Sequence, residues 1–152
     1  MRAIVGVLAA SLAVFGVASL ASAASDVAVA GAWSRPAVDN AVVYGVVRNT
    51  GSHRLTVVGA SSPEARTAEL HESVSMKGGA MDGMAMSAME MRPAGPVAIL
   101  PHGALTLKPG GYHVMLMGLR HPLAAGGRFP VTLRFADGSQ VTFEVPVENR
   151  AF

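Results

Sequence analysis

Short segments of the chain are either apolar and β-branched or alternate between apolar and polar residues, and turn residues separate these segments at close intervals. Alternation with a period of two is typical of β-strands that are buried on one face. The pattern predicts strands at residues 26–33, 41–48, 55–60, 66–73, 89–92, 97–100, 104–107, 112–119, 128–135 and 140–147. Asp137-Gly138, between the last two, predicts a hairpin. No long amphipathic helical pattern competes, so the sequence predicts an all-β barrel or sandwich of short, mostly antiparallel strands.

Residues 76–88 depart from this alternation. They include three glycines and no aromatic or β-branched residue, so they are poorly suited to a strand. We expect a loop that joins the strand at 66–73 to the short strand at 89–92. A helix over residues 81–91 is the alternative, and Gly83 disfavours it.

The N-terminus has the pattern of a secretory leader. Met1-Arg2 is a short positive start, residues 3–20 are an apolar run, and Ala21-Ser22-Ala23 matches a signal-peptidase site. The sequence therefore predicts a cleaved signal peptide at residues 1–23 and a single domain at residues 24–152. An uncleaved membrane anchor is the alternative, because eighteen apolar residues approach the length of a membrane span.

Charge gives no sign of a nucleic-acid or membrane-surface role. Twelve Lys and Arg against ten Asp and Glu give a net charge of +2, and the basic residues are scattered rather than clustered. Cysteine is absent, so no disulfide can stabilise the fold.

Methionine and histidine gather between His71 and Met117. This stretch holds eight of the nine methionines and three of the five histidines, in a chain without cysteine. Imidazole and thioether donors without thiolate favour a soft monovalent metal, for which copper(I) is the obvious candidate. In the strand at 66–73, His71 shares a face with Glu69 and Ser73.

The strand at 112–119 carries a second group of donors on one face. The buried side would be supplied by Tyr112, Val114, Leu116 and Leu119, which leaves His113, Met115 and Met117 on the exposed side. Residues two apart on a strand lie about 6.5–7 Å apart, so His113 and Met115 can reach one ion. Methionine as core filler is the alternative when this strand is taken alone. The second cluster, His71 with Met91, favours a metal site.

These motifs resemble the periplasmic copper(I) chaperones of the PCu(A)C type. The family pattern is a histidine, then a methionine before arginine, and after twenty-one further residues His-x-Met; here residues 92–112 separate Met91 from His113-Val114-Met115. Other matches include Ala32-Trp33-Ser34-Arg35-Pro36, Ala68-Glu69-Leu70-His71-Glu72 and the segment from Leu107 to Leu119. The resemblance implies a cupredoxin-like β-barrel and a copper(I) site made of His71, Met91, His113 and Met115.

The spacing between the first histidine and the methionine departs from the family. Nineteen residues separate His71 from Met91, more than is usual there. The entropic cost of closing a loop grows slowly with its length, so the excess need not displace Met91. Met86 and Met89, which has the strand parity of Met91, remain alternatives for the ligand from this segment.

The resemblance implies a periplasmic, monomeric, non-enzymatic carrier. It would deliver copper(I) to the CuA site of cytochrome c oxidase, and the receiving protein would be the oxidase subunit or a Sco-type thiol protein. The alternative is a periplasmic protein that buffers copper or confers resistance. Its extra copper(I) ions would be bound by Met76, Met81, Met84, Met86 and Met89, unless these methionines are incidental to a disordered insert.

Two other classes are disfavoured. A blue-copper electron carrier needs a cysteine thiolate, and the chain has no cysteine. Glu69 and Glu72 flank His71 as acid–base groups would, but no serine or cysteine nucleophile motif accompanies them.

Overall fold

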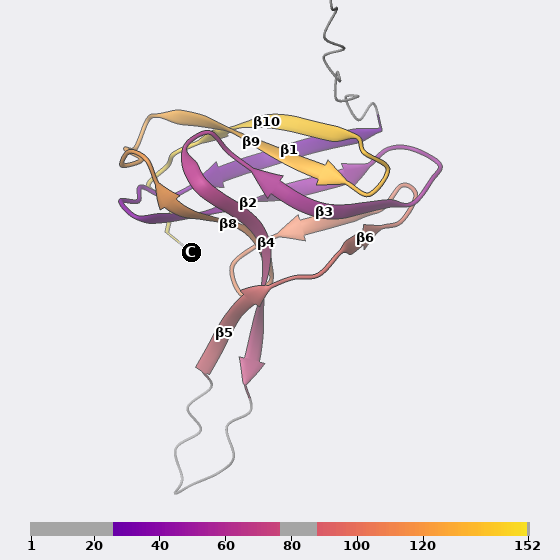
Figure 1. The fold of residues 1–152 in the computed structure, drawn as a ribbon, viewed down its shortest axis with the longest axis horizontal. Helices are drawn as coiled ribbons and strands as arrows, with labels where there is room; N and C mark the ends of the chain where they lie inside the picture. Colours follow the sequence, from indigo (N-terminus) through magenta and orange to yellow (C-terminus); the bar gives the residue numbers. More distant parts are fainter. Residues whose placement is uncertain (1–25, 77–87, 152) are drawn as a thin grey trace, which may run out of the picture.

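The computed structural model describes residues 26–76 and 88–151, which form ten β-strands and no helix (Figure 1). The strands are β1 (Val27–Ser34), β2 (Asn40–Asn49), β3 (Leu55–Ser61), β4 (Ala65–Met76), β5 (Ala88–Pro93), β6 (Val97–Ile99), β7 (Ala104–Leu107), β8 (Tyr112–Leu119), β9 (Arg128–Phe135) and β10 (Gln140–Pro146). Each strand predicted from the sequence is present. The largest difference is β4, which extends beyond the predicted end at Ser73.

The strands form one sheet that nearly closes on itself. Their order is β1-β2-β7-β8-β4-β3-β9-β10, with β5 added to β4 and β6 added to β3. The pairing of β7 with β8 is parallel, and the other strand pairs are antiparallel. A bridge between Ser34 and Val147 joins the two ends of this order, and the Glu148 N–H donates to the Ser34 carbonyl. The predicted all-β barrel of mostly antiparallel strands is therefore confirmed.

The interior is filled by the inward-facing side chains of the strands. In β9, Phe129, Val131, Leu133 and Phe135 alternate with more exposed residues and are at most 2% exposed. In β8, Val114 and Leu116 are fully buried, as the alternation predicted. Burying a side chain of this size stabilises a fold by about 1.5–3 kcal/mol. Because the apolar side chains of each strand are buried in this core, the side chains on the other face point away from it.

The turn between β9 and β10 is the predicted Asp-Gly hairpin. Asp137 Oδ1 accepts hydrogen bonds from the Ser139 N–H at 2.8 Å and from the Ser139 hydroxyl at 2.6 Å. Gly138 has a φ of 85°, a backbone conformation that glycine adopts without strain.

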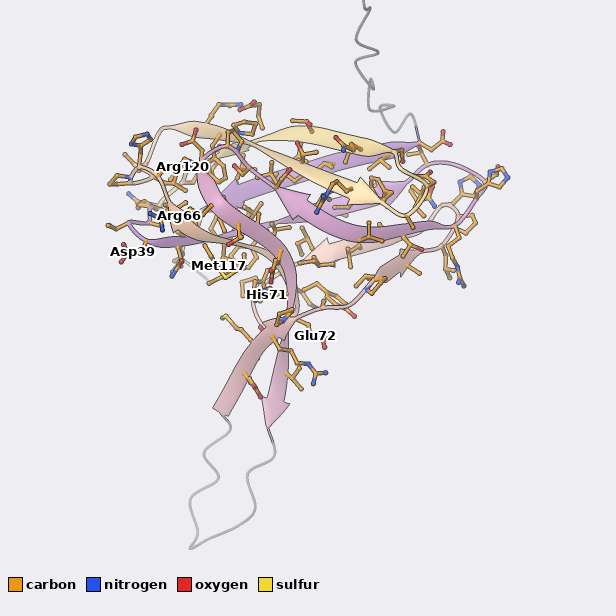
Figure 2. The ribbon with its side chains drawn as sticks, in the orientation of Figure 1. Asp39, Arg66, His71, Glu72, Met117 and Arg120 are labelled. Atoms are coloured by element: carbon orange, nitrogen blue, oxygen red, sulfur yellow. The ribbon has the colours of Figure 1, made fainter. Side chains whose placement is uncertain are left out.

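β4 and β5 form a hairpin that projects from the body of the barrel (Figure 1). β5 pairs with β4 from His71 opposite Pro93 to Met76 opposite Ala88. The N-terminal part of β4 pairs instead with β8, as far as Glu72 opposite Tyr112. His71 therefore lies where β4 leaves the barrel wall and enters the hairpin, and Figure 2 shows His71 and Glu72 at this junction.

Part of the sequence prediction falls outside the described residues. The leader at residues 1–23 lies there, as does most of the predicted loop at 76–88. The alternative helix over residues 81–91 is wrong where the structure describes it, because residues 88–91 belong to β5 and pair with β4. Over the described ranges, no helix is long and apolar enough to cross a membrane.

Candidate metal centre

Two histidines from neighbouring strands lie side by side at the base of the hairpin. His71 of β4 is directly opposite His113 of β8. Their ring centroids are 5.9 Å apart, and the ring planes are inclined by 58°. His71 is 8% exposed and His113 is 1% exposed. Residues 42 positions apart in the chain thus form one buried imidazole pair.

The burial of His113 corrects the sequence prediction. His113 shares its face of β8 with Met115 and Met117, as expected, but it is buried whereas both methionines are partly exposed. His71 lies against it, and the turn before β8 is held to β4 by a 3.1 Å hydrogen bond from the Ser73 N–H to the Gly111 carbonyl. Alternation within one strand identifies a face, but it does not identify the neighbouring segment that covers that face.

His113 is held in one tautomer by the main chain. Its Nδ1 lies 3.1 Å from the Gly111 carbonyl oxygen, which can only accept, so Nδ1 carries the proton. Nε2 then bears the lone pair, and it is buried without a hydrogen-bond partner. Burial lowers the pKa of His113, the hydrogen bond to Gly111 raises it, and the neighbouring His71 lowers it. The net shift is downward, which keeps the imidazole neutral and able to bind a metal at pH 7.

His71 has a carboxylate partner. Its Nε2 lies 3.2 Å from Oε2 of Glu69, two residues earlier on β4. Its other ring nitrogen, Nδ1, is buried without a hydrogen-bond partner. Histidines that bind metals usually donate their second ring N–H to a carboxylate or a backbone carbonyl, and these two histidines contact one of each.

Four methionines lie on the same face of the sheet as the two histidines. On β8, Met115 is opposite Glu69 and Met117 is opposite Thr67. On β5, Met91 is opposite Ser73 and Met89 is opposite Ser75. Residues directly opposite each other in antiparallel strands point to the same face, so this face carries two imidazoles and four thioethers.

The methionines differ in their distance from the histidine pair. Met115 is two residues from His113 and diagonal to His71, and Met91 is diagonal to His71 on the other side, with such diagonal positions about 7–8 Å apart. Met91 is 56% exposed, so its thioether lies at the surface of the site. The structure thus brings His71, His113 and Met115 together and places Met91 beside them.

Met89 lies one step further along the hairpin. It is 57% exposed, and its Cε is 3.4 Å from the position that a Cβ would occupy on Gly110. Its side chain therefore reaches across β4 toward the turn that leads into His113. Met81, Met84, Met86 and the side chain of Met76 lie outside the described residues.

The donor set suits a soft metal ion. Among the described residues, no group of three or more His, Asp or Glu is placed to hold a metal ion. Two imidazoles with thioethers nearby are ligands that favour copper(I) over magnesium or calcium, which prefer oxygen. The other histidines, His53, His102 and His121, are exposed, as expected for surface residues.

Two contacts at this centre were not assigned from the sequence. One is the Gly111 carbonyl on His113, and the other is the Glu69 carboxylate on His71. The shared strand parity of Glu69 and His71 was the signal for the second contact. Glu69 also lines a cavity of about 560 Å³ along β3 and β4, which includes Gly59 and Arg134 but none of the histidines or methionines.

Comparison with known proteins assigns the family. Residues 27–147 match the family described as "Putative lipoprotein LpqE-like". The chain belongs to the LpqE-like family. This LpqE-like chain is also 42% identical over 127 residues to "Putative lipoprotein Lxx21020" of Leifsonia xyli subsp. xyli, which covers 83% of the chain and 72% of the relative.

Solved structures of PCuAC domains share the fold. The apo PCuAC domain from PmoF1 superposes with a TM-score of 0.63 at 22% identity and covers 83% of the LpqE-like chain and 96% of that domain. The solution structure of CuI-DR1885 from Deinococcus radiodurans superposes with a TM-score of 0.56 at 30% identity, covering 82% and 81%. The predicted cupredoxin-like fold and the predicted resemblance to PCuAC proteins are thereby confirmed.

Proposed function

We propose that this chain is a copper(I) carrier that holds one ion at His71, His113, Met115 and Met91. The observation that carries the proposal is the pair of buried ring nitrogens, Nδ1 of His71 and Nε2 of His113, that have no hydrogen-bond partner. A buried polar atom without a partner costs about 1–3 kcal/mol, so a fold retains it where a ligand satisfies it. The likeness to the copper(I) form of DR1885 at 30% identity supports the same assignment.

The chemistry of these ligands suits both uptake and release. Imidazole and thioether are neutral, so binding needs no thiol deprotonation and the loaded site keeps the charge of the ion. Copper(I) imposes little geometry and binds thiolates more strongly than thioethers. Transfer to a protein that offers cysteine thiolates is therefore downhill. The exposed Met91 supplies the side from which such a thiolate approaches.

We further propose that the carrier works in the periplasm, with residues 24–152 as its single domain. The leader pattern at residues 1–23 supports export, and so does the description of the family and of its curated relative as lipoproteins. The resemblance to the PCu(A)C type supports delivery to the CuA site of cytochrome c oxidase, either directly or through a Sco-type thiol protein. Nothing in this role requires a catalytic step.

A copper(I) titration against a competing chelator tests the proposal. The wild-type protein is expected to bind one ion, and the double variant His113→Ala/Met115→Ala is expected to lose more than about 100-fold in affinity, since even outer-shell partners contribute 10–100-fold. The matched control is His121→Ala/Met117→Ala, which removes an exposed histidine and the next methionine on the same face of β8. The control is expected to bind as the wild type does.

Folding and stoichiometry are measured in the same samples. Because His113 is buried, Met115→Ala alone is included as a variant that removes a partly exposed ligand. Equal affinity of the double variant and the wild type would remove the basis of the proposal. A stoichiometry of two or more ions would instead favour copper buffering by the methionines of residues 76–89.

A further inference from the structure

We propose that Glu69 is a positioning residue that sets the tautomer of His71, so that copper(I) is bound by Nδ1 of His71 and by Nε2 of His113. The two imidazoles would thus bind one ion through different ring nitrogens, Nδ1 in His71 and Nε2 in His113. This inference rests on the proposed copper(I) site.

The contact between Glu69 and His71 distinguishes the two neutral tautomers. An ionised carboxylate has no proton to donate, so its Oε2, 3.2 Å from His71 Nε2, accepts a hydrogen bond from that nitrogen. Nε2 therefore carries the proton and Nδ1 bears the lone pair. The opposite tautomer would place two acceptors against each other. It would also bury an Nδ1–H group without an acceptor, which is unfavourable.

The arrangement that leaves no N–H group unsatisfied has one proton, on Nε2. In that arrangement the buried Nδ1 atom offers a lone pair, which is what a metal ion requires.

The two histidines are oriented by different kinds of partner. A backbone carbonyl holds His113, and no substitution removes that oxygen. A side chain holds His71, and this side chain is 47% exposed, so it can be replaced without opening the core. Glu69 also lies directly opposite Met115 and two residues from His71, so it neighbours two proposed ligands.

Nitrogen-15 NMR of the histidine rings tests the inference, first without metal and then with copper(I), which is diamagnetic. In the wild-type protein at neutral pH, the proton is expected on Nε2 of His71 and on Nδ1 of His113. Copper(I) is then expected to shift the unprotonated nitrogens, Nδ1 of His71 and Nε2 of His113. In Glu69→Ala, the His71 nitrogens are expected to move toward the average of a tautomer mixture, and copper(I) affinity to fall about 10–100-fold.

Glu72→Gln is the matched control. Glu72 is also in β4, but it alternates to the other face and pairs with Arg92 at 2.8 Å rather than with His71. Its variant is expected to leave the His71 nitrogen shifts and the copper(I) affinity unchanged. Glu69→Gln adds an isosteric side chain that can still accept from Nε2, and it is expected to retain more of the wild-type tautomer than Glu69→Ala.

The possible results separate this inference from the proposed function. A proton on Nδ1 of His71, copper(I) bound through Nε2 of that ring, or unchanged shifts and affinity in Glu69→Ala would overturn the role of Glu69 while the carrier function stands. A wild-type protein that binds no copper(I) would overturn the carrier function, whatever the tautomers of the metal-free protein.

Discussion

Buried polar side chains in this protein differ in whether the fold satisfies them. Asn49 is 2% exposed, and its Nδ2 donates to the carbonyls of His53 and Ile99 while its Oδ1 accepts from the Gly51 N–H. His71 and His113 are similarly buried, yet each keeps one ring nitrogen without a partner. The fold therefore satisfies the side chain of Asn49, whereas each of the two imidazoles keeps a ring nitrogen that the fold does not use.

Asn49→Ala is expected to lower the free energy of unfolding by about 2–3 kcal/mol, because it removes one buried and two partly buried hydrogen bonds to the main chain. Chemical denaturation followed by circular dichroism measures the change. Asn40→Ala is the control, since its Oδ1 accepts from the Gly118 N–H at an exposed site, and a loss below about 1 kcal/mol is expected. A loss as small at Asn49 would mean that water replaces its three bonds.

The β4–β5 hairpin shows why strand register matters more than loop length for the ligand from β5. Met91 is opposite Ser73 and Met89 is opposite Ser75. Both serine side chains are small, and the Met89 side chain extends across β4 as far as the turn at Gly110. Pairs on both sides of Met91 hold it in register with Ser73, and these pairs extend as far as Met76 opposite Ala88. The long spacing from His71 is thus compatible with Met91 beside the histidines.

Met89 and Met91 are expected to substitute for each other as the thioether from the hairpin. Each single alanine variant would then lose less copper(I) affinity than is expected when a site loses its one thioether ligand. The loss of copper(I) binding free energy in the double variant would exceed the sum of the two single losses by at least about 0.5 kcal/mol. Competition titrations of the two single variants and the double variant measure this coupling.

The pair Met91→Ala and Met117→Ala is the control cycle, because these residues lie on different strands and on opposite sides of the histidine pair. Additive losses are expected for that pair. Additivity for Met89 and Met91 as well would assign the ligand to Met91 alone.

Over the whole molecule, local sequence patterns predicted the strands but not which strands lie side by side in the sheet. The alternation of four large apolar residues with less apolar ones is enough to recognise β9, because side-chain direction along a strand has a period of two. Which strands lie side by side depends on contacts between distant residues, and one strand's pattern carries no information about them. The bridge between Ser34 and Val147, which nearly closes the barrel, could not be predicted for this reason.

For the candidate site too, the sequence predicted the residues, whereas their arrangement depends on contacts between strands. The face shared by His113, Met115 and Met117 followed from parity, and the resemblance to the PCu(A)C family implied the roles of His71 and Met91. The direct opposition of His71 and His113 depends on the register between β4 and β8. The burial of His113 depends in addition on the turn at Gly110-Gly111, whose position against β4 no local pattern encodes.

The Gly111 carbonyl accepts two hydrogen bonds, one from the Ser73 N–H at the base of the hairpin and one from His113 Nδ1, each 3.1 Å long. An ion held by Nε2 would restrain the imidazole and, through it, this oxygen. The Ser73 amide proton should then exchange with solvent deuterons several-fold more slowly in the copper(I)-loaded protein than in the metal-free protein. The Ser139 amide, bonded to Asp137 in the distant β9–β10 turn, should exchange at the same rate in both, and equal rates at Ser73 would rule out the coupling. Through the Gly111 carbonyl oxygen, the base of the hairpin would thereby open less often when copper(I) is bound than when the site is empty.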